Sequence, residues 1–183
     1  MLQRLTDITP VIMHPDIDEM AIKFEKPRVY AARIAGEKLA RIAEKVENMP
    51  EFAEKNAVII CADTVCSRGS FILPKAENSE DVQKCMKMLS GRNHDVFTAI
   101  SAKNLKTGQT CHKISHTKVK FKHLSQKDIE DMVKSGSGLG KAGGYTINGF
   151  AESFIIQING SYSGIVGFPL YEVRNILVSF GIL

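Results

Sequence analysis

The chain has 183 residues, of which 24 are Lys or Arg and 20 are Asp or Glu, and its formal net charge is +4. This length fits a single domain, 1–183, that can bury a substantial core. The near balance of charges argues against nucleic acid as a partner, and no apolar run approaches the roughly 18 residues that a membrane span needs. The four cysteines form no Cys-x-x-Cys pair, so we expect free thiols and a reducing, cytoplasmic compartment.

An acidic cluster precedes the first predicted helix. Asp16, Asp18 and Glu19 stand within four residues, where they repel one another unless water screens them or a cation binds them. From Pro27 onward, apolar residues recur at helical spacing. We expect a helix whose buried stripe consists of Ala32, Ala35, Leu39, Ile42, Ala43 and Val46.

Two basic residues of this predicted helix differ in their position. Lys38 falls at the border of the buried stripe, where a long side chain can extend into a cleft. Arg33 points well away from the centre of the stripe. We therefore expect Arg33 to be solvated or paired.

The apolar run 57–61 leads into Asp63 and Thr64. It predicts a buried strand that brings Asp63 to its C-terminal edge, where ligands bind in α/β sheets. Asp63 is therefore a candidate catalytic or metal-binding acid. The alternative is that Asp63 and Thr64 only start a turn or cap the next element. Residues 71–75 then predict a returning hairpin strand that brings Lys75 back near Asp63.

The middle of the chain alternates between helix and strand patterns. A helix starts at Ser79, and strands are predicted at 95–102 and 110–121, with a turn at 104–109 between them. Ser125 caps another helix, which Gly136 ends. The apolar faces of these two helices are Val82, Cys85, Met86 and Leu89, and Ile129, Met132 and Val133.

A segment rich in glycine and serine, 135–145, surrounds Lys141. Its glycines would let backbone amides approach an anion, although the order of residues is not that of a Walker loop. A mobile linker is the alternative. A strand at 154–158, the hairpin signal Asn159-Gly160 and a second strand at 161–167 follow. Pro169 opens a final helix, so the whole pattern indicates a mixed α/β fold.

Taken in order, these segments resemble the Maf family of nucleoside triphosphate pyrophosphatases. The resemblance implies a mixed, partly antiparallel sheet flanked by helices, with two lobes around a cleft, similar to the inosine triphosphate pyrophosphatases. The implied reaction converts a nucleoside triphosphate and water to the monophosphate and pyrophosphate, with Mg²⁺ or Mn²⁺, in a cytoplasmic protein that is commonly a homodimer. The matching segments are Asp16-Ile-Asp-Glu19, Arg33-Ile-Ala35-x-x-Lys38, Ala62-Asp-Thr-Val65, Ile72-Leu-Pro-Lys75, Leu89-Ser-Gly-Arg-x-His94-x-Val96-x-Thr98, Lys141-Ala-Gly-Gly-Tyr145-x-Ile147-x-Gly149, Gly160-Ser-Tyr-Ser163 and Val166-Gly-x-Pro-Leu170.

The resemblance also implies roles for particular residues. Asp63 matches the general base, and Asp63 and Glu19 match the acids that hold the cation. Three lysines match or supplement phosphate-binding positions: Lys38, Lys75 and Lys141.

Two further positions bear on the choice of nucleotide. Thr64 is similar to the branch that hydrolyses dTTP and UTP rather than the branch that acts on 7-methyl-GTP. At the position of Asn148, the dTTP/UTP branch usually has Gln. Since Asn is one methylene shorter, its hydrogen bond to a base needs a closer ligand or a bridging water.

The sequence departs from the family at its front, where an apolar strand and a Ser-x-Ser-Pro-Arg-Arg loop are expected. We therefore expect a Maf-like domain that is incomplete at the N-terminus. The alternative function is a catalytically impaired nucleotide-binding or cell-division regulatory protein, because lysines do not replace bidentate arginines on phosphate. A phosphatase with an aspartyl nucleophile is disfavoured, since Val65 stands where its second acid would be.

Overall fold

The computed structural model describes residues 1–47, 49, 52 and 57–183. Within these residues, one five-stranded sheet has the strand order β2-β1-β3-β4-β5. Its strands are β1 (Val58–Arg68), β2 (Phe71–Leu73), β3 (Asn93–Asn104), β4 (Thr110–Phe121) and β5 (Ile155–Asn159). The described strands pair only in antiparallel fashion. The predicted α/β class with helices around the sheet is confirmed, while the parallel pairs of a mixed sheet are not found in the described part of the chain.

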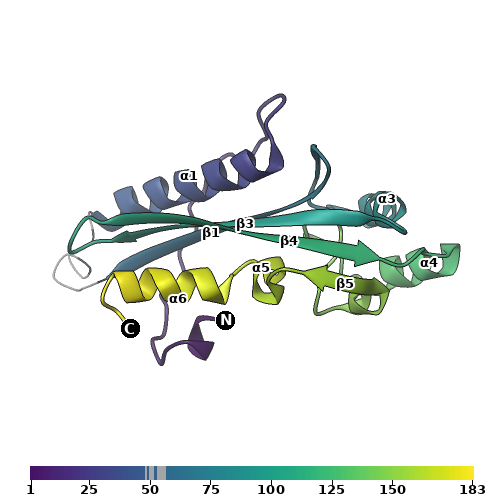
Figure 1. Ribbon diagram of the computed structural model, residues 1–183. Helices are drawn as coiled ribbons and strands as arrows, with labels where there is room; N and C mark the ends of the chain where they lie inside the picture. The colour runs from purple at the N-terminus through teal and green to yellow at the C-terminus, as the bar shows by residue number, and fades with distance from the viewer. Residues whose placement is uncertain (48, 50–51, 53–56) are drawn as a thin grey trace.

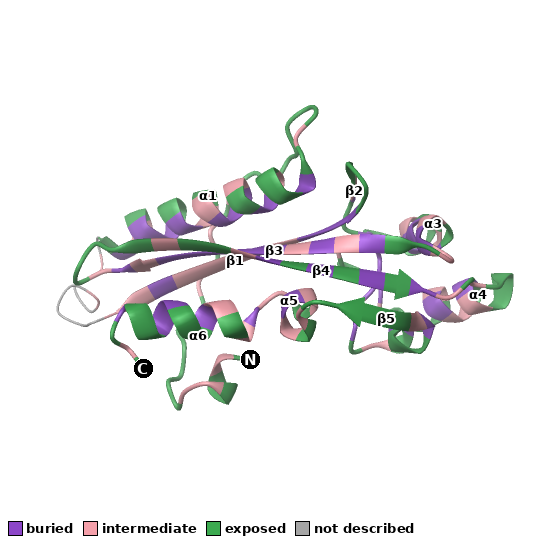
Figure 2. Ribbon diagram, in the orientation of Figure 1, coloured by how far each residue is buried: buried purple, intermediate pink, exposed green. Residues whose placement is uncertain are grey.

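Helices cover both faces of this sheet. They are α1 (Pro27–Glu47), α3 (Ser79–Leu89), α4 (Gln126–Lys134), α5 (Tyr162–Val166) and α6 (Leu170–Ser179), with short 3₁₀-helices η1 (Leu2–Arg4) and η2 (Phe150–Phe154). Figure 1 shows α1 on one face of the sheet and α5 and α6 on the other, with α3 and α4 at the far end. The buried sides of α1 and α6 face the sheet in Figure 2. The core therefore lies in two layers, one on each side of the strands.

The buried stripe of α1 differs from the prediction at one residue. The stripe runs through Ala31, Ile34 and Ala35 in the first half of the helix, whereas Ala32 is exposed. Residues two apart on a helix are separated by about 200°, so Ala32 and Ile34 point to nearly opposite sides. Because the helix contacts the sheet through Ile34 here, Ala32 faces away from it.

The predicted strand at 161–167 is wrong, because this segment forms α5. The Ser161 hydroxyl accepts a hydrogen bond from the Gly164 amide at 3.0 Å, which caps a helix start. Gly167 ends the helix in the left-handed conformation at φ 101°. The hairpin signal Asn159-Gly160 is therefore followed by a helical turn rather than by a returning strand.

Asp63 lies within β1 and not at its C-terminal edge, so the prediction that the strand ends at Asp63 is wrong. The strand continues because residues up to Ser67 remain paired with β3, with Asp63 opposite Ala99. On its other edge β1 pairs with β2 only at Cys66, Ser67 and Arg68. Among the described residues, no strand pairs with that edge of β1 over 58–65, and we call this stretch the open edge.

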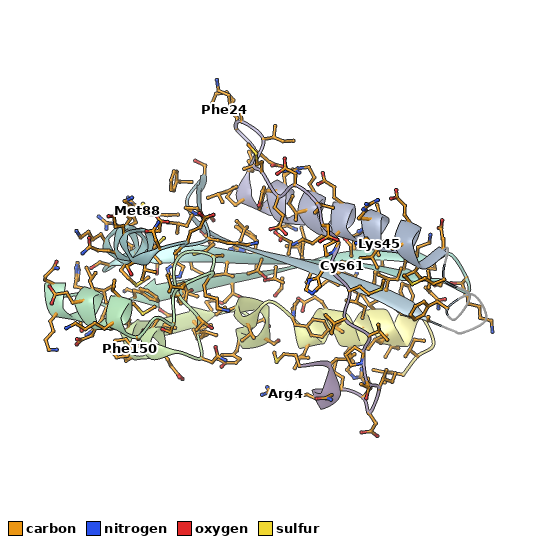
Figure 3. The ribbon with its side chains drawn as sticks, turned by 180° about the vertical axis from the view of Figure 1, so that it is seen from behind. Arg4, Phe24, Lys45, Cys61, Met88 and Phe150 are labelled. Atoms are coloured by element: carbon orange, nitrogen blue, oxygen red, sulfur yellow. The ribbon has the colours of Figure 1, made fainter. Side chains whose placement is uncertain are left out.

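The residues between η1 and α1, which we call the N-terminal segment, form turns and irregular backbone. In Figure 1 this segment passes from the α6 side of the sheet to the α1 side. Figure 3 shows Phe24 at the tip of the loop just before α1, pointing away from the sheet, and Phe24 is 91% exposed. The segment matters for the site because it carries Glu19.

Candidate active site

Four of the residues predicted for the site form a row of alternating charges. The Lys38 Nζ, from α1, lies 2.8 Å from Asp63 Oδ1 and 2.7 Å from Glu19 Oε1. Lys75 Nζ, two residues after β2, donates to Glu19 Oε2 at 2.6 Å. The Tyr30 hydroxyl holds the backbone of Glu19 by donating to its carbonyl oxygen at 2.7 Å. The sheet, the first helix and the N-terminal segment therefore meet at Lys38.

Asp63 has one carboxylate oxygen without a partner. Its side chain is 5% exposed, and the buried Oδ2 makes no hydrogen bond to any of the described residues, while Oδ1 accepts from Lys38. Burial raises the pKa of Asp63 above its ordinary value, although the hydrogen bond and charge of Lys38 act in the opposite direction. A buried carboxylate with a free oxygen and a raised pKa is suited to accept a proton.

The neighbouring groups keep their charges. Burial alone would lower the pKa of the Lys38 ammonium, but hydrogen bonds to Asp63 and Glu19 outweigh it and raise that pKa. Partial burial alone would raise the pKa of Glu19, but hydrogen bonds from Lys38 and Lys75 outweigh it and lower that pKa. The pKa shifts of Lys38 and Glu19 thus favour their charged forms, whereas the pKa of Asp63 is raised.

A cavity of about 280 Å³ opens beside this row and is lined by residues of the open edge of β1. Consecutive residues of a strand point to opposite faces, yet Asp63 and Thr64 both line the cavity. A ligand in it can therefore contact both faces of β1. The lining residues are Lys38, Ala62, Asp63, Thr64, Cys66, Lys75, Val96, Gly140, Lys141, Ala142, Tyr145, Thr146, Ile165 and Val166.

The glycine-rich segment forms one wall of the cavity and is tied to the chain that follows β2. The Ala76 amide donates to the Lys141 carbonyl oxygen at 3.2 Å, and the Gly140 amide donates to that of Ala76 at 2.8 Å. At Gly143, whose φ is 69°, an added Cβ would lie 2.6 Å from the Cys66 Sγ. These contacts tie the segment to the rest of the chain, unlike a free linker, and Lys141 lines the cavity. Anion binding by the segment stays a prediction.

Asn148 lies outside this lining and is exposed. Its Oδ1 accepts a hydrogen bond from the Thr146 hydroxyl at 2.6 Å, and it is Thr146 that lines the cavity. A role for Asn148 in nucleotide choice stays a prediction. Sequence reasoning missed Thr146, although its position next to Tyr145 in the glycine-rich wall was the available signal.

A buried pair supports the same wall from behind. His94 is fully buried, and its Nε2 lies 2.7 Å from the hydroxyl oxygen of Tyr145. Burial lowers the pKa of His94 to about 4, so the imidazole is neutral at physiological pH. Both residues belong to segments that the sequence singled out, but nothing in the spacing of residues 51 apart indicated that they touch.

The residues fit a divalent cation shared with a phosphate ligand. The described residues contain no group of three or more His, Cys, Asp or Glu side chains that could hold a metal ion. Mg²⁺, however, is commonly held by one or two carboxylates together with substrate phosphates and waters. Asp63, with its unpartnered buried oxygen, and Glu19 supply such a pair.

A larger cavity of about 440 Å³ lies between the N-terminal segment, α1, α6 and β1. It is lined by residues such as Val11, Ile42, Ile59 and Leu177, and no charged residue is among the described residues that line it. A lining without charged side chains does not suit a phosphate. Within the described part of the chain, no helix is both long enough and apolar enough to cross a bilayer.

Comparison with known proteins gives matches along nearly the whole chain. The family described as Maf-like protein matches residues 1–180. A dTTP/UTP pyrophosphatase of Chelativorans sp. (strain BNC1) is 40% identical over 166 residues, which are 91% of this chain and 78% of the relative.

Two further relatives are similarly close. A dTTP/UTP pyrophosphatase of Rhodopseudomonas palustris (strain HaA2) is 43% identical over 171 residues, covering 93% of this chain and 81% of the relative. A nucleoside triphosphate pyrophosphatase of Rickettsia akari (strain Hartford) is 43% identical over 183 residues, covering 99% of this chain and 88% of the relative.

Proposed function

The chain belongs to the Maf-like protein family, and we propose that it is a nucleoside triphosphate pyrophosphatase acting on dTTP and UTP. The names of the relatives support this activity and this substrate class. The observation that carries the proposal is the buried Asp63 with its unpartnered oxygen, set beside lysines in one cavity. Such an enzyme is a hydrolase that cleaves an acid anhydride.

The proposed step is attack of a water molecule on the α-phosphorus. Asp63 Oδ2 accepts a proton from that water, the bond from its oxygen to phosphorus forms, and the bridging bond to the β-phosphate breaks. The products are the nucleoside monophosphate and pyrophosphate. Lys38, Lys75 and Lys141 line the cavity and offset the negative charge of the phosphates.

Asp63 and Glu19 would hold the divalent cation, Mg²⁺ or Mn²⁺. When bound, the cation supplies positive charge next to the phosphate oxygens. Thr64, and Asn148 through Thr146, are proposed to contribute to the preference for pyrimidine nucleotides. We also propose a cytoplasmic location, which the free thiols of the four cysteines support. A homodimer and a single domain over 1–183 stay predictions.

The test is to incubate the purified chain with Mg²⁺ and separate samples of dTTP, UTP, CTP, GTP and 7-methyl-GTP, and to measure pyrophosphate and monophosphate. We expect release from dTTP and UTP, and a loss of at least about 100-fold in Asp63→Asn, since general bases contribute on that order. Asp95→Asn is the matched control, because Asp95 is a strand carboxylate paired with the His116 side chain at 2.7 Å. Unchanged release in Asp63→Asn, or release of orthophosphate instead of pyrophosphate, would contradict the proposal.

One observation favours a second candidate function. The described residues that line the cavity include lysines but no arginine, and lysines bind phosphate as point charges without bidentate hydrogen bonds. A nucleotide-binding regulatory protein with impaired catalysis would have such a site. Tight binding of dTTP without turnover stimulated by Mg²⁺ would identify it.

A further inference from the structure

A row of hydroxyl groups crosses the sheet on the face opposite Asp63. Thr64 on β1 and Thr98 on β3 are directly opposite each other, and their Oγ1 atoms are 2.9 Å apart. Thr98 is 1% exposed, and its hydroxyl also contacts the carbonyl oxygen of Gly164 in α5 at 2.7 Å. The row therefore connects the cavity to the backbone of α5.

The direction of both hydrogen bonds follows from the number of protons. A carbonyl oxygen only accepts, so the single hydroxyl proton of Thr98 is donated to Gly164. Thr98 then has no proton left for Thr64, and the Thr64 hydroxyl must be the donor in the bond between them. As a result, Thr64 has lone pairs but no proton to offer to a ligand in the cavity.

The surroundings keep these lone pairs accessible. Gly167 follows α5 with a φ of 101°, and a Cβ added there would lie 3.2 Å from Thr64 Oγ1. The absence of a side chain at Gly167 leaves room beside the hydroxyl. Ile165 and Val166, from the same turn of chain, supply an apolar part of the cavity lining.

This part of the cavity suits the base of a nucleotide rather than its phosphates. The lysine and carboxylate row that would face the phosphates includes Asp63, whose side chain points to the opposite face of β1 from that of Thr64. A hydroxyl without a free proton also gives nothing to a phosphate oxygen, which only accepts. A ring that carries an N–H group is the complementary partner.

We infer that Thr98 is a positioning residue that makes Thr64 a pure acceptor, and that this acceptor selects pyrimidines with an N–H at ring position 3. Uracil and thymine carry that N–H, whereas cytosine has a lone pair there and would place two acceptors against each other. The inference rests on the proposed function and deepens it by assigning the discrimination between UTP and CTP to one hydrogen-bond direction.

The test compares kcat/KM for UTP and CTP in the wild type, Thr98→Val and Thr98→Ser. Valine removes the hydroxyl, so that the Thr64 proton becomes free to turn toward a ligand, and the UTP to CTP ratio should fall about tenfold, the equivalent of one hydrogen bond. Serine restores the hydroxyl and should restore the ratio. A merely structural role would instead lower both rates together.

Further variants separate the effect of Thr98 on Thr64 from a general disturbance of the structure. In a Thr64→Val background, Thr98→Val should cause no further change of the ratio, because Thr98 acts only through Thr64. Thr117→Val is the matched control: Thr117 is 1% exposed and also bonds the chain at α5, through the Ser161 carbonyl oxygen at 3.2 Å. It should leave the ratio unchanged. If Thr98→Val does not fold, Thr98→Ala serves in its place.

Binding of the monophosphates keeps the two proposals apart. If the wild type releases no pyrophosphate from any nucleotide, the proposed function fails, and calorimetric binding of UMP and CMP to the same variants still tests the inference. We expect the wild type to bind UMP about tenfold more tightly than CMP, and Thr98→Val to remove that difference. Equal binding by the wild type, or an unchanged preference in Thr98→Val, would overturn it.

Discussion

Replacing His94 by Gln should make the unfolding free energy much less dependent on pH. His94 is fully buried against Tyr145, and burial lowers its pKa from 6.5 to about 4. In the unfolded chain the imidazole titrates at its ordinary value. Between these two values the unfolded chain binds more protons than the folded chain, so the protein loses stability as the pH falls.

The size of the effect follows from the two pKa values. With 6.5 in the unfolded and about 4 in the folded state, stability should fall by about 2 kcal/mol from pH 8 to pH 5 and about 3 kcal/mol to pH 4. Glutamine has no titrating ring and keeps an amide for the Tyr145 hydroxyl. The difference in unfolding free energy between wild type and His94→Gln should therefore shrink by these amounts in acid.

Urea unfolding at pH 8, 6, 5 and 4 measures this difference directly. Other groups that titrate in this range contribute equally to both proteins and cancel in the comparison. His14→Gln is the control, because His14 is exposed, and it should follow the wild type at every pH. Parallel curves for wild type and His94→Gln would refute the assignment of a neutral, buried imidazole behind the cavity wall.

Four other expected outcomes concern the site and the fold. Lys75→Met should raise the KM for UTP about fivefold, since a mostly exposed lysine gives a screened contact to phosphate, whereas Lys84→Met on α3 should not. The kcat/KM for UTP should fall as the pH is lowered, and the midpoint of this fall should lie above 3.8, the ordinary pKa of an aspartate, because burial raises the pKa of Asp63. Lys38→Met should move this fall to still higher pH by removing a hydrogen bond that lowers that pKa, and an unmoved profile would exclude Asp63 as the titrating base. Ser125→Ala should cost about 1 kcal/mol in urea unfolding, because Ser125 and Asp128 form a reciprocal cap at the start of α4; no loss would mean that α4 is held by packing alone.

The sequence predicted those elements whose pattern is set by local chemistry. The strand at 110–121 was placed at its observed bounds, because one side of β4 is buried and the other is exposed. The apolar face of α3 was predicted in full for the same reason. By contrast, β1 continues past Asp63 because β3 remains paired with it as far as Ser67. Pairing with a distant strand leaves no mark in the local sequence.

In the site, too, the residue types were predictable from the sequence, whereas their contacts across the chain were not. Asp63, Glu19, Lys38 and Lys75 were singled out by residue type and by family resemblance, and the structure brings them into contact. That Glu19 would lie between the two lysines depends on the path of an irregular segment, which periodicity does not describe. The bond from Thr98 to Gly164 also joins residues far apart in sequence, so no local sequence pattern indicates it.

The position of Glu19 has a consequence for how the cavity treats anions in solution. Its two oxygens lie 2.7 and 2.6 Å from the ammonium groups of Lys38 and Lys75, so it acts as a counterion supplied by the protein itself. Any anion that is to reach both lysines competes with this tethered carboxylate. Chloride brings one charge on a single atom to that competition, whereas a triphosphate chain brings several charges along its length. The contact that pairs Glu19 with both lysines therefore favours long polyanions over chloride at this end of the cavity.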